Sequence, residues 1–238
     1  MLATIRGSNS QDYDELLQQV WRFRHRQFVE RLGWDACRRA DGREMDQFDG
    51  DEAVHLPLIH AGEVVAYSRL LPTLKPHLLS DVYPHLTDGG EYPRGKCIFE
   101  WTKCIADPSD MTVRGISVSG MLIMGVMEYC LVTGIELLIV ETHQNFVNLL
   151  LTAGWDVRPL AAPTVLDDGS LIVPITARPT MAGLLRHHKL YGISGSVLDR
   201  KMLSEVHFDM SQPSHRASVE PPQAGRLFSR MAGESHAG

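Results

Sequence analysis

Two adjoining stretches near the N-terminus carry a high density of charged and aromatic side chains. The first, residues 20–34, interleaves arginines with aromatic and aliphatic residues at spacings that suit an amphipathic helix. The second, residues 41–52, contains six carboxylates, two glycines and few apolar residues. Arginines beside clustered carboxylates, with aromatic rings between them, suit a ligand that carries both a carboxylate and a cation. The alternative is a solvated charged helix followed by a surface loop.

Three further charged residues interrupt apolar segments that predict strands. Arg69 lies in VVAYSRLLP, Glu100 lies in CIFEWTK, and Lys103 follows Glu100 three positions later. A charge between core residues costs free energy unless it is paired or lies in a cleft. Asp46 and Asp49 are candidate partners for Arg69, and Glu100 and Lys103 are candidates for the same cleft. Outward-facing charges on an edge strand are the alternative.

The rest of the sequence predicts the elements that hold these side chains in place. A helix is expected over residues 12–32, a strand hairpin over 53–73, and a strand over 97–108. Residues 74–92 are rich in Pro, Gly and Asp and predict a long loop with a helical turn or two. The C-terminal half predicts a helix over 115–133, a strand over 135–143, a helix over 145–153, strands over 156–163 and 170–179 joined by a turn at 167–169, and a helix over 180–190.

These elements predict the fold class. Helices that cover a central sheet of antiparallel and parallel strands define an α/β protein, a three-layer α/β/α sandwich with a mixed central sheet. We expect one domain over residues 1–203, because the length fits one domain and the sequence has no internal repeat. Residues 204–238 are polar and rich in Pro, Gly and Ser, which predicts a flexible tail.

Composition and charge argue against several classes of protein. The net charge of -6 and the lack of a Lys/Arg-rich block argue against nucleic-acid binding. The most apolar run, residues 120–140, is interrupted by Glu128, Gly134 and Glu136, so it does not predict a membrane span. The N-terminus lacks the apolar core of a signal peptide, and the four cysteines lack the spacing of metal ligands. We therefore expect a cytoplasmic protein with free thiols and no metal.

Common nucleotide-binding and hydrolase motifs are missing from the sequence. There is no GxGxxG opening a helix after the first strand, no GxxxxGK[ST], no GxSxG and no HExxH. Residues 114–120 (RGISVSG) stand at the predicted start of a helix, where free N–H groups are able to hold a pyrophosphate, as in acetyltransferases that bind acyl-CoA. An ordinary helix N-terminus is the alternative.

A longer pattern of residues resembles a known family, the LuxI-type acyl-homoserine lactone synthases. It consists of RxxxFxxxxxW, then ExDxFD, then a strand pair ending in SRLLPT, and the resemblance covers roughly residues 1–200. The resemblance implies a fold similar to that of the GNAT acetyltransferases. It also implies synthesis of a quorum-sensing signal from S-adenosylmethionine (SAM) and an acyl thioester on acyl carrier protein or coenzyme A. Methylthioadenosine is the second product, both small molecules are substrates, and no cofactor is implied.

The resemblance implies roles for individual residues. Glu100 is expected to accept the proton of the SAM amine, with Asp46 as the alternative base or as an orienting partner. An aromatic face suits the sulfonium, and Arg24 or Arg69 suits the SAM carboxylate unless Arg69 is a structural partner of Asp46. The SAM-binding candidates are Arg24, Phe28, Trp34, Glu44, Asp49 and Arg69, and the candidates for the acyl and thioester site are Trp101, Lys103, Met124 and Thr142.

The sequence departs from the common family pattern at two neighbouring positions. Lys103 stands where most members have arginine, which keeps the charge but loses the bidentate fork and puts that residue's carboxylate pairing in doubt. Trp101 favours a short, branched or aromatic acyl group, and the phrases ADGREMDQFD and FEWT resemble the subgroup that uses acyl-CoA or aryl-CoA. A GNAT-like N-acyltransferase acting on a different amine is the first alternative function. A non-catalytic ligand-binding regulator is the second.

Overall fold

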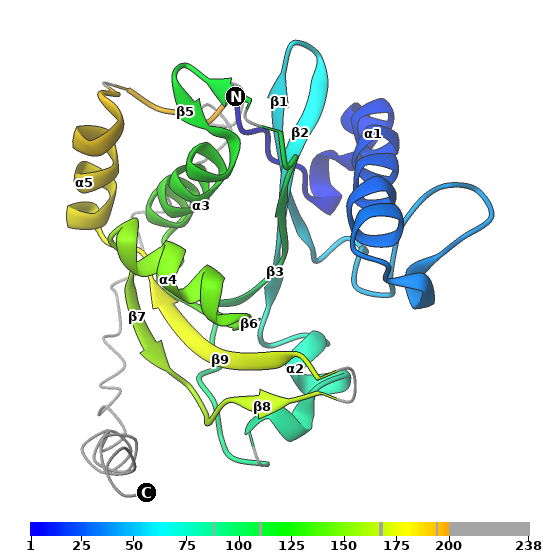
Figure 1. The fold of residues 1–238 in the computed structure, drawn as a ribbon, viewed down its shortest axis with the longest axis vertical. Coiled ribbons are helices and arrows are strands. Elements are labelled where there is room, and N and C mark those ends of the chain that lie inside the picture. Colours follow the sequence, from blue (N-terminus) through cyan, green and yellow to red (C-terminus); the bar gives the residue numbers. More distant parts are fainter. Residues whose placement is uncertain (88, 110, 167–168, 194, 200–238) are drawn as a thin grey trace, which may run out of the picture. The chain divides into compact units, whose positions relative to one another are not determined.

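A mixed β-sheet runs through the residues that the computed structural model describes, which are 1–87, 89–109, 111–166, 169–193 and 195–199. Its strands lie in the order β1-β2-β3-β6-β9-β7, and β8 pairs with β9 beside this path (Figure 1). The strands are β1 (Val54–His60), β2 (Glu63–Pro72), β3 (Ile98–Ala106), β6 (Leu137–Thr142), β7 (Asp156–Pro159), β8 (Thr164–Val165) and β9 (Leu171–Arg178). The predicted tail at 204–238 lies outside the described residues.

The sheet changes from antiparallel to parallel pairing at its centre. β2 is antiparallel to β1 and β3, whereas β6 runs parallel to β3 and antiparallel to β9. Parallel pairing joins only Ile98, Phe99 and Glu100 of β3 to β6. After this point β3 continues along β2, and β6 continues along β9. The two central strands therefore separate directly after Glu100.

Helices cover both faces of the sheet (Figure 1). On one face, α1 (Asp14–Arg24) continues as a π-helical segment, His25–Arg31, and packs against β2 through an apolar cluster. On the other face lie the buried, apolar helix α3 (Val118–Thr133), α4 (Gln144–Thr152) and α5 (Met181–Tyr191). This arrangement confirms the predicted α/β class, with a mixed central sheet between layers of helices. Within the described residues, every helix is too short or too polar to cross a membrane.

The predicted long loop between β2 and β3 covers the point where the central strands separate. It contains a one-turn helix, α2 (Leu78–Asp81), and a 3-10 turn, Pro84–Thr87. Leu79 and Leu86 of this loop are buried in one apolar cluster with Ile139 of β6. Two more 3-10 segments, Gly7–Tyr13 and Asp35–Cys37, flank α1 and its π-helical continuation.

The segment before α3 differs from the prediction. A helix was expected from residue 115, but α3 begins at Val118 and follows a short hairpin of β4 (Thr112–Val113) and β5 (Ile116–Ser117). Arg114 and Gly115 between these strands have φ angles of 55° and 77°. Two positive φ angles are typical of a two-residue hairpin turn, whose usual sequence signal is Asn-Gly or Asp-Gly. Arginine stands in place of Asn or Asp in this pair, so the sequence gives no turn signal here and predicts a helix that begins too early.

Candidate active site

Two buried arginines form the centre of a charged cluster between α1, the acidic segment and β2. Arg24 and Arg69 are both 0% exposed. Arg24 Nε donates to Glu44 Oε2 at 2.5 Å, and Arg24 Nη1 donates to Asp49 Oδ1 at 2.7 Å. Arg69 Nη1 donates to Asp46 Oδ1 and to Asp49 Oδ1, at 2.6 Å each. The arginines and carboxylates that the sequence singled out therefore lie together, and Arg69 is paired with both of its candidate partners.

Charge pairing outweighs the effect of burial in this cluster. Burial by itself would raise the pKa of Asp49, but the guanidinium groups of Arg24 and Arg69 hold that pKa well below its usual range. Burial opposes ionisation of Asp46 as well, and hydrogen bonding to Arg69 lowers its pKa on balance. Both carboxylates are therefore ionised at neutral pH. Removal of one member would leave its partner as a buried charge without compensation.

Asp46 is the carboxylate of the cluster that a ligand reaches most easily. Its side chain is 21% exposed, compared with 0% for Glu44 and 2% for Asp49. The side chains of Arg24 and Arg69 have no exposed surface. The cluster therefore offers an approaching ligand a carboxylate and no guanidinium, which suits the ammonium group of an amino acid.

Phe28 and Trp34 form a stacked aromatic pair beside the cluster. Their ring centroids are 4.8 Å apart with an interplanar angle of 24°, and Trp34 is 45% exposed. The backbone N–H of Trp34 donates to the carbonyl of Phe28 at 2.9 Å, which fixes the turn between them. The Nζ atom of Lys103 lies 4.9 Å from the centroid of Phe28 and 5.5 Å from that of Trp34. The pair therefore already holds a cation, an arrangement favoured by the negative faces of aromatic rings.

A β-bulge in β3 turns Lys103 toward this aromatic pair. The β2–β3 register shifts between Arg69↔Thr102 and Tyr67↔Ile105, and Lys103 has a φ angle of 53°. Thr102 Oγ1 accepts from Arg69 Nε at 3.0 Å, so Thr102 and Lys103 both face the cluster, although strict alternation would send them to opposite faces. The carboxylate pairing put in doubt by the arginine-to-lysine change is present, because Lys103 Nζ lies 3.0 Å from Glu44 Oε1.

Glu100 lies under the first turn of α2. It is 0% exposed, and its two carboxyl oxygens accept the backbone N–H groups of Leu78 at 2.9 Å and Leu79 at 2.6 Å. Burial raises the pKa of Glu100 to about 7, although these donors and Arg69 act in the opposite direction. A carboxylate with a pKa near the working pH is suited to accept a proton as a general base.

Glu141 is a residue of this site that the sequence analysis missed. It stands near the end of β6, two residues beyond Ile139, the register partner of Glu100, and the two carboxyl groups interact. Burial raises the pKa of Glu141 well above its usual value, and the charge of Glu100 raises it further. The signal that singled out Arg69 and Glu100, a charge on an apolar strand, is also present in the segment IELLIVETH.

Trp101 and Met124 lie on the α3 side of the sheet, apart from the charged cluster. Trp101 is 2% exposed, donates its ring N–H to Ser68 Oγ, and packs against Phe146 and Trp155 at centroid distances of 5.5 Å and 5.2 Å. Met124 is 0% exposed in α3. The four acyl-site candidates are thus divided between two faces, because the bulge places Lys103 in the cluster.

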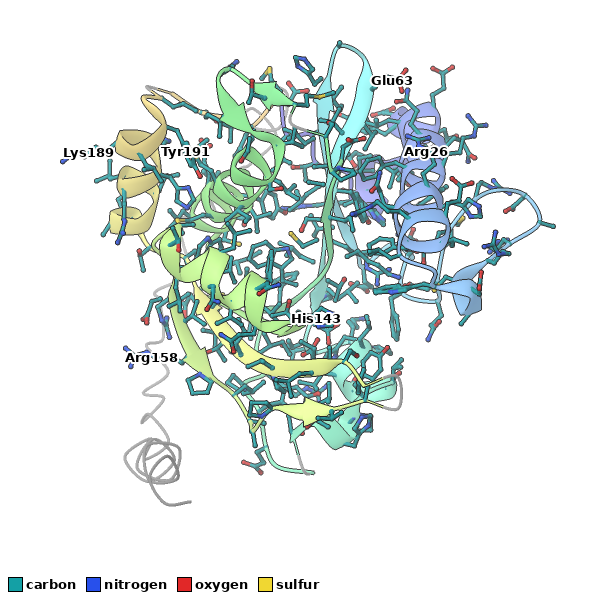
Figure 2. All side chains as sticks on the ribbon, in the orientation of Figure 1. Arg26, Glu63, His143, Arg158, Lys189 and Tyr191 are labelled. Carbon is teal, nitrogen blue, oxygen red and sulfur yellow. The ribbon has the colours of Figure 1, made fainter. Side chains whose placement is uncertain are left out.

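Thr142 ends β6 and is paired there with Val173 of β9. The next residue, His143 (labelled in Figure 2), is the N-cap position of α4. Thr142 directly follows Glu141, so it belongs to the same end of β6 as the carboxyl pair.

Two cavities border the neighbouring surface. One of about 390 Å³ is lined by residues that include Arg6, Phe99 and Tyr129, and one of about 270 Å³ is lined by residues that include Trp21 and Asp49. Neither of these two cavities is lined by Glu100 or by the Phe28–Trp34 pair. The second cavity borders the charged cluster at Asp49.

The carboxyl pair gives a testable dependence of stability on pH. A glutamate of the unfolded chain releases its proton above about pH 4.3, whereas the raised pKa keeps a proton on Glu141 in the folded protein. The folded state then binds more protons, so the free energy of unfolding falls as the pH rises above that value. We expect Glu141→Gln to gain stability relative to the parent between about pH 5 and about pH 8. Thermal midpoints of both proteins at the two pH values check this, and a pH-independent difference would contradict it.

The fold and the site together define the class of the protein. A mixed sheet that separates beside a buried carboxylate suits the transfer of an acyl group to an amine, and the similar proteins below make this protein an acyltransferase. Within that class, the chain belongs to the autoinducer synthase family, whose model matches residues 8–176. The family membership expected from the sequence is therefore confirmed.

Similar proteins include both curated synthases and solved structures. The chain is 32% identical over 170 residues to the isovaleryl-homoserine lactone synthase of Bradyrhizobium diazoefficiens, an alignment that covers 71% of this chain and 75% of that protein. It is similar to the structure of the CoA-dependent acyl-homoserine lactone synthase BjaI with SAM and isopentyl-CoA, with 30% identity and a TM-score of 0.76 over 84% of this chain and 93% of that one. The CoA-dependent synthase MesI is similar at 30% identity and a TM-score of 0.76, over 84% of this chain and 100% of that one.

Proposed function

We propose that the protein makes an acyl-homoserine lactone, a quorum-sensing signal, from SAM and an acyl-CoA. The observation that carries the proposal is the aromatic pair that holds the Lys103 ammonium beside Asp46, because a sulfonium amino acid needs the same aromatic faces and carboxylate. The similar protein BjaI, whose structure contains SAM and isopentyl-CoA, supports these substrates. The reaction takes place in the cytoplasm, where both substrates are available, and uses no cofactor.

In this proposal, SAM binds between the charged cluster and the aromatic pair. Phe28 and Trp34 face the sulfonium, and Asp46 receives the ammonium group because it is the exposed carboxylate of the cluster. Arg24, Glu44, Asp49 and Arg69 then act by holding Asp46 and the aromatic helix in position. This assignment gives the two arginines a structural part in SAM binding, since both guanidinium groups are already paired with carboxylates.

The first chemical step is N-acylation. Glu100 takes a proton from the SAM ammonium, whose free amino form then attacks the thioester carbonyl. An N–C bond forms and the C–S bond of the thioester breaks. The amine loses its second proton to the departing thiolate, which leaves as the thiol of CoA. A free α-amino group has a pKa of about 7.7–8.0, so a base with a pKa of about 7 is sufficient.

The second step is lactonisation. A carboxylate oxygen of the acylated SAM attacks its own γ-carbon, and the bond from that carbon to the sulfonium breaks. Methylthioadenosine leaves with the electron pair of that bond, and the homoserine lactone ring closes. Because the nucleophile and the electrophile belong to one molecule, correct positioning supplies most of the required acceleration.

The acyl group is proposed to be short, branched or aromatic. Trp101, Phe146 and Trp155 fill the α3 side of the sheet with three aromatic rings in contact, which leaves little room there for a long straight chain. The isovaleryl product in the name of the Bradyrhizobium relative is consistent with such a group. Met124 of α3 and Thr142 at the end of β6 are the further candidates for contact with the acyl chain.

The aromatic pair gives a prediction for SAM binding. Trp34→Ala removes one face of the pair and is expected to weaken SAM binding by roughly 2–30-fold, the equivalent of about 0.5–2 kcal/mol of cation–π attraction. Trp34→Phe keeps an aromatic face and is the matched control. Isothermal titration of each variant with SAM and with acyl-CoA checks this. Equal losses for both ligands would instead assign Trp34 to folding.

The choice of acyl carrier is tested with a panel of donors. The purified protein is incubated with SAM and matched acyl groups, straight, branched and aromatic, on CoA and on acyl carrier protein, and methylthioadenosine and free thiol are measured. We expect equal amounts of both products, fastest with a short branched or aromatic acyl-CoA. Thiol release without methylthioadenosine would identify a plain N-acyltransferase. Faster turnover with acyl carrier protein would overturn the assignment of CoA.

A further inference from the structure

The Glu100–Glu141 pair lies where the two central strands separate. Glu100 is the last residue of β3 that pairs with β6, and its partner there is Ile139. Glu141 stands two residues further along β6, so it shares a face of the sheet with Ile139. The side chains of Glu100 and Glu141 therefore lie on one face at the point of strand separation, and two interacting buried carboxyl groups are held together at low cost only when one of them keeps a proton.

The donors around the pair are unequal and indicate which member is ionised. The carboxyl group of Glu100 accepts the backbone N–H groups of Leu78 and Leu79. Glu141 receives its own backbone N–H, while its Oε1 atom is inaccessible to solvent and has no hydrogen-bond partner among the described residues. Two backbone donors stabilise a negative charge on Glu100, whereas a charge on Glu141 would be buried with little compensation.

The other charged groups near the pair favour the same distribution. Arg69 of β2 interacts with Glu100 and favours its ionised form. Tyr83 and Tyr92, from the loop that contains α2, face the pair as neutral phenols whose pKa burial raises. A cation, Arg69, therefore lies on the β2 side of the pair, next to Glu100. The groups near Glu141 are apolar or neutral, so the negative charge is more stable on Glu100.

We propose that Glu141 is a positioning residue that stays protonated and donates a hydrogen bond to Glu100, so that Glu100 remains the ionised proton acceptor and the buried pair carries a single charge. The proposal rests on the function proposed above. In the acylation step Glu100 takes the ammonium proton, the pair becomes neutral, and the proton returns to solvent after the products leave. Glu141 keeps its own proton throughout, so no additional reactant is needed.

Two variants at position 141 separate this role from a structural one. The side-chain amide of Glu141→Gln is still able to donate a hydrogen bond to Glu100. Its kcat/KM is therefore expected to stay within about threefold of the parent, and the pKa that governs the acidic side of its pH profile is expected to stay the same. Glu141→Leu has no donor. The pKa that governs the acidic side of its pH profile is expected to rise by about one unit, so that kcat/KM falls about fivefold at pH 7 and recovers at alkaline pH. Identical pH profiles for Gln and Leu, or an equal loss in both, would overturn the proposal. Glu136→Gln, at an exposed position just before β6, is the matched control.

A second measurement needs no activity. The carboxyl carbons of ¹³C-labelled glutamate are titrated by NMR in the unliganded parent and in both variants. We expect one carboxyl that titrates near pH 7 in the parent and in Glu141→Gln, and at higher pH in Glu141→Leu. Glutamates that all titrate below about pH 5.5 would overturn the proposal. If the protein made no lactone from any donor, the proposed function would fail, and this titration would still decide whether the pair exists.

Discussion

Replacement of Glu100 by glutamine is expected to lower kcat by roughly 10²–10⁴-fold, the usual contribution of a positioned acid or base. Glutamine cannot accept a proton at neutral pH, while its carbonyl oxygen is still able to accept one of the two N–H groups of α2. The Phe28–Trp34 pair and Asp46 are unaltered in this variant, so SAM is expected to bind with an affinity close to that of the parent. Steady-state release of methylthioadenosine, together with calorimetric titration of SAM, checks both parts.

The variant must be distinguished from one that simply unfolds. Glu100 holds the long loop against the sheet through Leu78 and Leu79, so the thermal midpoint of Glu100→Gln is measured alongside its activity. A folded variant that turns over as fast as the parent would remove Glu100 from the mechanism and leave Asp46 as the candidate base. Weaker SAM binding in proportion to the lost activity would show that Glu100 acts in binding.

The second large effect is expected in the charged cluster. Arg69→Met removes the cation between Asp46 and Asp49, and we expect it to destabilise the fold by about 3–5 kcal/mol, the usual result when one partner of a buried ion pair is lost. Methionine is similar in length and apolar, so packing against β2 changes little and the effect arises from the unpaired carboxylates. Urea unfolding of both proteins measures the difference.

Arg38→Met is the matched control for this prediction. Arg38 also pairs with an aspartate, Asp35, but both side chains are more than half exposed, at 53% and 74%. Exposed pairs contribute about 0–1 kcal/mol, so the control is expected to unfold almost like the parent. Similar losses in the two variants would show that burial of the cluster has no energetic consequence, contrary to the prediction.

Acid supplies an independent test of the same cluster. The pKa values of Asp46 and Asp49 are lowered in the folded protein, so their contribution to stability is complete above the unfolded value of about 3.9 and is lost as the pH falls below it. In Arg69→Met the main cation for Asp46 is gone, and the acid-dependent part of the stability should be smaller. An unchanged acid dependence would place the stabilising cation elsewhere.

The sequence was sufficient to predict the α/β class, the elements around the site and the residues of the charged cluster. Arg69 stood out because a charge within an apolar strand requires a partner, and the structure supplies Asp46 and Asp49 from the acidic segment. The long loop over 74–92 was also predicted, because its Pro, Gly and Asp content disfavours a long helix or strand. In each case, a local rule of composition or periodicity agreed with the tertiary structure.

Other features depend on contacts that no local rule contains. The orientation of Lys103 follows from a bulge in β3, and a strict two-residue alternation places that side chain on the wrong face. The hairpin before α3 has the usual glycine at Gly115, but Arg114 stands where the turn signal has Asn or Asp. Glu141 became important only when the parallel register of β3 and β6 placed it beside Glu100. Register between strands distant in sequence was not predictable from either strand alone.

The central claim is that one site acylates the amine of SAM and then closes the lactone. The direct test uses SAM labelled with ¹³C only in the carbons that become the homoserine lactone, and not in its S-methyl group. The protein is incubated with this SAM and a short branched acyl-CoA, and the products are measured by mass spectrometry. The account predicts that the label appears in an acyl-homoserine lactone, in an amount equal to that of unlabelled methylthioadenosine. Recovery of intact labelled SAM while the acyl group passes to another amine and CoA is released, or accumulation of an acylated SAM without lactone, would contradict it.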